Sequence, residues 1–308
     1  MSNRISFHDQ ISRNKLKSFF LILIIFIVFV GLGIIIGMVM GPDYFLMIMI
    51  LAIIISIIYL ITGYYKSDKI ALASVNAKPA RQSEYPQYHH SVEALCLASG
   101  MPKPKLYVME EKNINAFASG RDPKHAVLCF TTGALEKFDK QELEGVIGHE
   151  LSHIANYDIR FMTLTAILVG MIAIISQIFI RSLWWNSISG GGNRDRGNSQ
   201  IVFMIIGIVM AILAPIVVTL VQLSISRKRE YSADASAVKF IRSPTGLTNA
   251  LKKIDNEHPS PEQVKEEKKK ISKAVAPLFI SDPFKKKVQN AFSTHPSIKK
   301  RIEILERM

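Results

Sequence analysis

The stretch "GVIGHELSHIANYD", Gly145 to Asp158, carries two histidines four residues apart and a glutamate beside the first. On a helix this spacing puts His149 and His153 on one face, one turn apart, where both imidazoles can bind one metal ion. Glu150 is rotated by about 100° around the helix from His149. That direction suits a general base acting on water beside the metal better than it suits a ligand.

The sequence around this stretch predicts a capped helix preceded by a small sheet. Asp139 is the expected N-cap, and Glu142 three residues later completes a capping box. Upstream, residues 67–100 are predicted to be mostly helical, and three short strands should follow. They are "PKPKLYVMEE", "NINAFASG" and "HAVLCFTTG", and their order along the chain predicts a small antiparallel sheet.

Two long uncharged runs near the N-terminus predict a membrane hairpin. Phe19 to Met40 is about 33 Å long as a helix, and Tyr44 to Tyr65 is similar. Both are apolar all round, which a soluble helical hairpin would not be. The first run is too long for the apolar core of a signal peptide and has no small-residue cleavage site after it, so we expect an uncleaved anchor.

A second hairpin is predicted from Phe161 to Ile180 and from Ile201 to Ile225, joined by a Gly-rich linker over 181–200. Trp184 and Trp185 at the edge of the linker are typical of a membrane interface. The alternative is a pair of apolar helices that lie on the membrane surface or on the catalytic domain. The fold class predicted is a mostly helical α+β membrane protein with four transmembrane helices in two hairpins.

The distribution of charge predicts how the first hairpin is oriented. Basic residues flank it on both sides, and the turn between its helices has no Lys or Arg. Both flanks should therefore stay in the cytoplasm, with 41–43 and the 181–200 linker outside it. The net charge is +13, and we expect the basic residues to bind anionic lipid headgroups rather than nucleic acid, since no nucleic-acid motif accompanies them. Cys96 and Cys129 are expected to be free core residues in a reducing compartment.

The third ligand is predicted from topology. A catalytic zinc needs three protein ligands and an open fourth position. If the second hairpin leaves and returns, the helix that holds His149 and His153 meets the helix that holds Glu230. Asp234, one turn after Glu230, is the candidate carboxylate to orient a metal-bound histidine, with a plain surface aspartate as the alternative. Asp158 is expected to anchor its helix near the membrane surface.

Five motifs in order resemble the HtpX family of membrane-bound zinc peptidases, which is related to the CAAX prenyl endopeptidases. They are "GVIGHELSHIANYD", "NINAFASG", "TTGALEKF", "REYSADASAV" and "STHPSIKKRIEIL". The resemblance implies a gluzincin-type catalytic domain that faces the cytoplasm, with one zinc per chain. It gives ligand roles to His149, His153 and Glu230, and the role of base to Glu150.

The same resemblance implies two further features of the site. An edge strand formed by Asn115, Ala116, Phe117 and Ala118 would pair with the substrate backbone, whereas the plain alternative is an inner strand. His295 and Arg301 would approach the site and stabilise the developing oxyanion. The plain alternative is a helix cap followed by a solvated arginine.

The predicted organisation has five parts, and the predicted function is cleavage of membrane proteins. Residues 1–18 are predicted to form a cytoplasmic segment, and residues 19–65 the first hairpin. The first part of the catalytic domain is predicted over 66–160, the second hairpin over 161–225 and the second part of the catalytic domain over 226–308. The expected substrates are misfolded or exposed segments of proteins in the cell (inner) membrane, cleaved for quality control. The alternatives are a prenyl-protein endopeptidase and a non-catalytic zinc-bearing membrane adaptor. The sequence predicts no oligomeric state.

Overall fold

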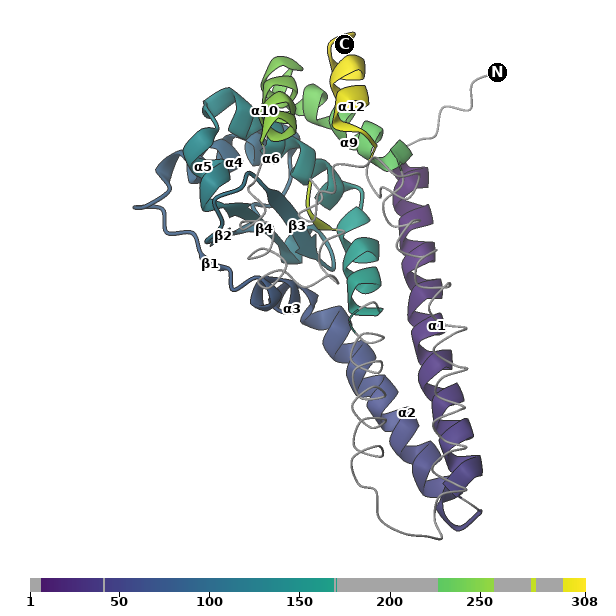
Figure 1. Cartoon of the computed structure of the whole chain (residues 1–308). Coiled ribbons are helices and arrows are strands. Elements are labelled where there is room, and N and C mark those ends of the chain that lie inside the picture. The colour runs from purple at the N-terminus through teal and green to yellow at the C-terminus, as the bar shows by residue number, and fades with distance from the viewer. Residues whose placement is uncertain (1–6, 41, 169, 171–226, 258–277, 281–295) are drawn as a thin grey trace, which may run out of the picture.

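The computed structural model describes residues 7–40, 42–168, 170, 227–257, 278–280 and 296–308. A long helical hairpin extends from a compact α+β domain; the described chain begins beside that domain and ends at the side opposite the hairpin (Figure 1). Most of the second predicted hairpin, its linker and His295 fall outside the described residues. Of that hairpin, residues 161–168 and 170 are described and are helical.

The hairpin consists of α1 (Phe7–Met40) and α2 (Pro42–Tyr65). Both contain a segment long and apolar enough to cross a membrane, which agrees with the two N-terminal spans predicted. Side chains such as Leu46 and Ile58 are exposed, as lipid-facing side chains of a spanning helix are. At 34 residues α1 is about 51 Å long, which exceeds a bilayer core of about 30 Å. It is therefore longer than one crossing requires, and its first turns lie beside the α+β domain (Figure 1).

The sheet has four strands in the order β1-β2-β4-β3. They are β1 (Lys78–Pro79), β2 (Lys105–Met109), β3 (Ala116–Gly120) and β4 (Ala126–Thr131). The three predicted strands are present, and β1 adds a short fourth strand in a stretch predicted to be mostly helical.

The prediction of an antiparallel sheet is wrong, because β4 lies between β2 and β3 and runs parallel to β2. After β3, the 3-10 turn Pro123–His125 returns the chain as an antiparallel hairpin, and every residue of β4 is buried. Every residue of β3 is buried as well, so burial does not distinguish the two strands, and the pairing of β4 with both β2 and β3 leaves β3 as the terminal strand.

Helices cover this sheet and surround α6 (Lys140–Ala155), the helix of the quoted stretch. Both hydrogen bonds of the predicted capping box between Asp139 and Glu142 are present. Around the sheet and α6 lie α3, α4, α5, α9, α10 and α12, which span Ser67–Ser74, Pro86–Ser99, Thr132–Lys137, Arg227–Ile241, Thr245–Asn256 and Ile298–Leu305.

Two glycines of the quoted stretch let neighbouring helices approach α6 closely. A Cβ added at Gly145 would lie 2.5 Å from the backbone nitrogen of Leu247 on α10. A Cβ at Gly148 would lie 3.4 Å from Ala237 on α9, the helix that also carries Glu230. These glycines give up about 1 kcal/mol each of helix propensity relative to alanine. In return, α9 and α10 pack against the face of α6 next to the histidines.

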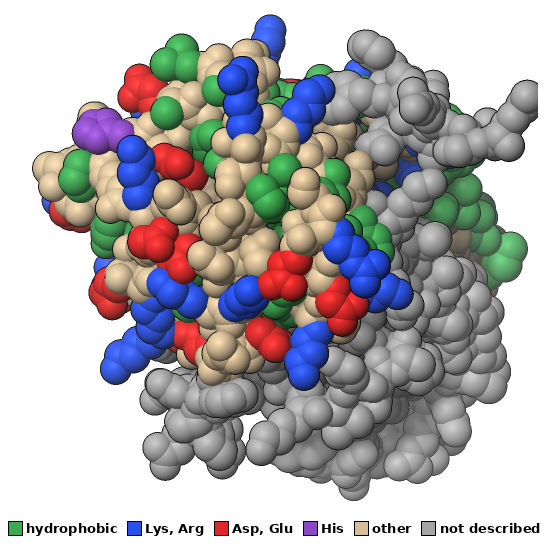
Figure 2. All heavy atoms as spheres, turned by 90° about the horizontal axis from the view of Figure 1, so that it is seen from above, with side chains coloured by type: hydrophobic (Ala, Val, Ile, Leu, Met, Phe, Trp, Pro, Cys, Tyr) green, Lys and Arg blue, Asp and Glu red, His purple; other side chains and the backbone are tan. Residues whose placement is uncertain are grey.

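The core of the domain lies between the sheet and the helices, with Leu128, Phe130 and Ile147 among its fully buried side chains. Cys96 and Cys129 are both buried and free, as predicted. The surface at the end opposite the hairpin mixes Lys and Arg with Asp and Glu side chains (Figure 2). The described part of this face therefore does not gather the net positive charge of the chain into one patch.

Candidate metal centre

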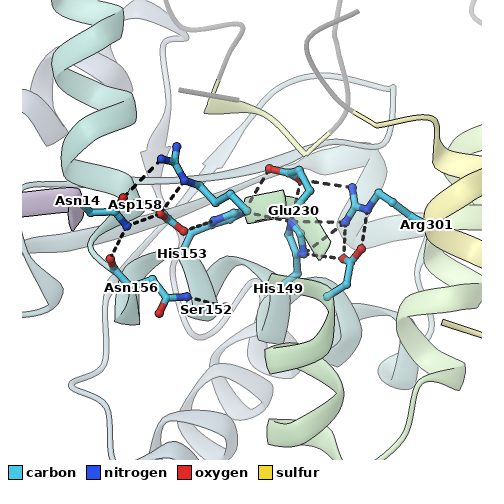
Figure 3. Close-up of polar contacts among 10 residues, drawn as sticks. Asn14, His149, Ser152, His153, Asn156, Asp158, Glu230 and Arg301 are labelled. Atoms are coloured by element: carbon cyan, nitrogen blue, oxygen red, sulfur yellow. Dashed lines mark hydrogen bonds and ion pairs between the residues drawn. The ribbon is translucent and has the colours of Figure 1, made fainter. Parts of the chain in front are cut away.

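His149 and His153 on α6 and Glu230 on α9 meet in the interior of the domain (Figure 3). All three side chains are buried, with exposed fractions of 0%, 5% and 2%. The two Nε2 atoms lie 3.2 Å apart. Glu230 Oε2 lies 3.6 Å from Nε2 of His149, and Oε1 lies 3.7 Å from Nε2 of His153. The topological prediction that Glu230 would reach the two histidines therefore agrees with the geometry.

These distances fit a metal ion with tetrahedral geometry. Nitrogen and oxygen ligands about 2.0–2.1 Å from a tetrahedral zinc lie about 3.3 Å from one another. The two Nε2 atoms lie close to this separation, a different oxygen of Glu230 faces each of them, and one ligand atom from each residue lies within 4.8 Å of the other two. Two neutral imidazoles with one carboxylate are a donor set that zinc accepts. They would hold the ion on three sides and leave the fourth position for water or substrate.

His149 is supported by Asp234, as its position on α9 predicts. Nδ1 of His149 lies 3.0 Å from Asp234 Oδ1. Because a carboxylate can only accept, Nδ1–H donates to Asp234 and Nε2 keeps its lone pair for a metal. Arg301 Nη2 lies 3.3 Å from the same Nδ1, and since both groups are donors, its contribution there is charge rather than a hydrogen bond.

Arg301 comes from the C-terminal helix α12 and is 1% exposed, so the alternative of a solvated arginine is wrong. Its Nε and Nη2 form a bidentate pair with Asp234, at 2.9 and 2.6 Å. Its Nη1 lies 3.6 Å from Glu230 Oε2. Arg301 thus compensates two buried carboxylates that would otherwise repel each other.

Burial and the Arg301 cation lower the pKa of His149, but Asp234 and Glu230 outweigh them and raise that pKa to about 9. For Glu150, burial is the main cause of a raised pKa, and Glu230 adds to it against the opposing histidines and Arg301. Glu150 is 2% exposed. A carboxylate with a raised pKa in a dry site is better suited to accept and return a proton than an ordinary surface glutamate.

His153 has a different partner, Asp158, whose Oδ2 lies 3.1 Å from its Nδ1 (Figure 3). Asp158 is buried, and its other oxygen lies 2.8 Å from Arg229 Nε and 2.7 Å from Asn14 Nδ2. The sequence pattern predicted only an anchoring role for Asp158, and nothing in it indicated Asn14 or Arg229. The one signal in the sequence for a contact with His153 was an acidic residue five positions later. The contacts of Asp158 with α1 and α9 could not be predicted, because they join segments that are far apart in the sequence.

The strand predicted to receive substrate, Asn115–Ala118, corresponds to the start of β3, the terminal strand of the sheet. The alternative of an inner strand is therefore wrong. The outer side of β3 is nevertheless partnered, because Phe117 forms an antiparallel bridge with Phe279. Ile280 N–H also donates to the carbonyl of Ala116 at 2.9 Å. Residues 278–280 thus occupy the edge at Ala116 and Phe117, and an extended peptide could pair at these two positions only in their place.

Comparisons with known proteins agree with the motifs. Residues 82–308 match the model of peptidase family M48. The chain is 47% identical to a "Protease HtpX homolog" of Caldanaerobacter subterraneus subsp. tengcongensis, with 84% of each chain covered. It is 39% identical to one of Streptococcus agalactiae, covering 98% of this chain and 99% of that one. Ste24p of S. mikatae, a solved structure, aligns with a TM-score of 0.49 and 19% identity, covering 96% of this chain and 66% of Ste24p.

Proposed function

The chain belongs to the M48 family of peptidases, as a membrane-bound metalloprotease of the HtpX type, and we propose that His149, His153 and Glu230 hold one catalytic zinc ion. The observation that carries this proposal is the convergence of three buried ligand atoms within 4.8 Å of one another. Two of them come from one helical turn and the third from a helix 77 positions later in the chain. Such a set, with a buried glutamate beside it, is typical of a gluzincin.

The proposed reaction is hydrolysis of a peptide bond. When bound, zinc supplies a Lewis acid that polarises the scissile carbonyl and acidifies water. Glu150 accepts a proton from the attacking water and passes it to the leaving amine as the carbon–nitrogen bond breaks. Asp234 and Asp158 hold the rings of His149 and His153 through their Nδ1–H groups, which leaves both Nε2 atoms to bind an ion.

The oxyanion that develops in this reaction needs a positive or donor group nearby. Arg301 brings a buried cation to the site, but its Nε and Nη2 are committed to Asp234. We therefore propose that the main role of Arg301 is to pair with Asp234 and Glu230, and not to stabilise the oxyanion. The proposal from the family motif that His295 stabilises the oxyanion stands on that motif alone.

The proposed substrates are misfolded or exposed segments of membrane proteins, and the proposed role is quality control. The two apolar helices keep the protease at the membrane, where such segments occur. The turn between α1 and α2 has no Lys or Arg, and basic residues lie on both flanks of the hairpin. This distribution supports an active site that faces the cytoplasm of a multi-pass protein of the cell (inner) membrane.

The proposed docking site for substrate is the edge of β3. Backbone pairing suits a protease of many sequences, because it reads the main chain and not side chains. Asn115 pairs inward with Thr131 and Ala116 pairs outward with Ile280, so by strand alternation the N–H of Phe117 faces β4. Phe117→Pro therefore removes a donor between β3 and β4 and distorts the edge from the inside. We expect this variant to cleave poorly while it keeps its zinc, and normal cleavage by zinc-loaded Phe117→Pro would exclude this edge as the docking strand.

The experiment that tests the function is cleavage of an unfolded membrane protein by the purified chain, with zinc, with a chelator and after zinc is restored. We expect cleavage that the chelator abolishes and zinc restores. A zinc-loaded protein that never cleaves such a substrate would contradict the proposal. Cleavage that depends strictly on a prenyl group would replace quality control with prenyl-protein processing.

A further inference from the structure

The first turns of α1, which precede its uncharged run Phe19–Met40, carry a buried polar face. Asn14 is 7% and Ser18 is 2% exposed, whereas the neighbouring Lys15 and Leu16 are exposed. Further along the same helix, Leu21 and Ile25 pack against Phe161 and other apolar residues of 158–168. The buried face of α1 thus lies along the helix that follows the metal-binding helix (Figure 1).

The carboxamide of Asn14 reaches the connection between these two helices (Figure 3). Its Nδ2 donates to Asp158 Oδ1 at 2.7 Å and to the carbonyl of Asn156 at 2.9 Å. Its Oδ1 lies 3.5 Å from Nη2 of Arg229, which neighbours the predicted ligand Glu230. Both ends of one small side chain therefore bind groups that lie more than 140 positions away.

The connection itself has an uncommon backbone that points Asp158 at His153. Five residues along a continuous helix would place a side chain on a different face. Here α6 ends at Ala155, and Tyr157 has a left-handed φ of 59°, which costs a non-glycine residue about 1 kcal/mol or more. The reversal lets Asp158 Oδ2 approach His153 Nδ1 at 3.1 Å while its Oδ1 faces Asn14 and Arg229.

We infer that Asn14 is a positioning residue for the metal centre, which fixes the Asp158 carboxylate and through it the ring of His153. The inference rests on the proposed function, because it requires His153 to bind the metal. Its consequence is that the first membrane helix, when seated correctly, completes the support of the centre. Asn14 is joined to Asp158 by a hydrogen bond, whereas the Lys17 ammonium of the same helix acts on Asp158 through its charge.

A purely structural role for Asn14 would make a different prediction. Loss of a buried hydrogen bond lowers stability wherever it lies, but it changes zinc affinity only if the bond orients a ligand. Ser18 provides the matched control, because it is one turn away on the same buried face. Its hydroxyl donates to the carbonyl of Asn14 within α1 and not to the α+β domain.

The experiment compares the full chain with Asn14→Ala, Asn14→Leu, Ser18→Ala, Asp158→Asn and the double variant Asn14→Ala with Asp158→Asn. Asn14→Leu keeps the branched shape of the side chain but removes its hydrogen bonds. It replaces Asn14→Ala in the comparison if Asn14→Ala does not fold. The readouts are the zinc dissociation constant, from competition with a chelator, and the visible absorption of Co²⁺ bound in place of zinc. Thermal unfolding of the metal-free protein separates stability from metal binding.

We expect Asn14→Ala and Asn14→Leu to weaken zinc binding by about 3- to 10-fold, less than the 10- to 100-fold typical of losing a direct partner such as Asp158. Their Co²⁺ spectra should shift, and Ser18→Ala should match the unmodified chain in both readouts. In the double variant the effect of Asn14→Ala should disappear, because Asn14 acts through Asp158.

The inference is overturned if Asn14→Ala and Ser18→Ala bind zinc alike, or if the effect of Asn14→Ala persists unchanged in the Asp158→Asn background. Either result leaves the proposed function intact. A full chain whose zinc affinity does not change on His149→Ala would instead overturn the metal centre, and the inference with it.

Discussion

The two histidines of the centre differ in where their support comes from. His149 is held by Asp234 and Arg301, which belong to α9 and α12 of the α+β domain. His153 is held by Asp158, which is in turn held by Asn14 of the membrane helix α1. Each side repeats one scheme: a buried carboxylate accepts from Nδ1–H and is bound by an arginine.

This difference indicates that the centre spans a junction within the molecule. The His149 side is complete within the domain that folds around α6. The His153 side needs the first turns of a helix that continues into the membrane. A soluble fragment that begins after α2 would therefore keep one supported histidine and leave the other with a less constrained partner.

The largest effect is expected on the His149 side, from Arg301→Met. Arg301 compensates Asp234 and Glu230, and removing one member of a buried ion pair costs about 3–5 kcal/mol. Lys300→Met on the same helix is the control, since Lys300 is exposed and such changes usually stay within about 0.5 kcal/mol. Denaturant unfolding of both variants measures the difference, and equal stabilities would mean that the Arg301 pair does not support this side.

The next effect compares the two carboxylates directly. Asp234→Asn and Asp158→Asn each remove the charge behind one histidine, and we expect each to weaken zinc binding about 10- to 100-fold. Glu303→Gln is the control, because Glu303 is exposed on α12. Chelator competition gives the affinities. If only one of the two variants lowered the affinity, the description of two equivalent supports would have to be given up.

The smallest effect concerns protons released when zinc binds. The pKa of His149 is raised from its usual 6.5 to about 9, so the metal-free protein keeps the proton of His149 at pH 8. Zinc must displace it, and we expect about one proton more to be released by the unmodified chain than by Asp234→Asn, which lacks the carboxylate that raises this pKa. Calorimetry in two buffers with different ionisation enthalpies counts the protons, and equal counts would contradict the assignment.

The same shift sets how the stability of the metal-free protein depends on pH. A pKa raised in the folded state contributes stability that is complete below about 6.5 and is lost as the pH rises through about 9. Metal-free protein should therefore lose this contribution in alkali. Zinc-loaded protein should gain stability over the same range, since fewer protons compete with the metal.

Much of the centre could be predicted because its signals are local or follow from simple topology. The capping box and the spacing of His149 and His153 are properties of one helix. Glu230 was predicted from a second hairpin that would leave and return and so bring its two ends together, and residues 171–226 of that hairpin lie outside the described residues. Asp234 followed as the acid one turn further on.

The features of the fold and the site that could not be predicted depend on contacts between segments far apart in the sequence. The order of the sheet depends on β4 entering between β2 and β3, which strand patterns do not encode. The contact of Asp158 with His153 requires the left-handed Tyr157, and a helical periodicity would point that side chain elsewhere. Residues 278–280 and Asn14 reach the site from far along the chain, and no spacing in the sequence marks them.

The central claim, that Glu230 binds the metal and Glu150 moves the proton, is tested most directly by zinc content measured together with cleavage. Glu150→Gln keeps the three ligands and the shape of the side chain but cannot accept a proton, so it should retain about one zinc per chain and cleave nothing. Glu230→Ala should lose zinc and cleavage together. A Glu150→Gln protein without zinc, beside a Glu230→Ala protein that keeps its zinc and still cleaves, would contradict the account.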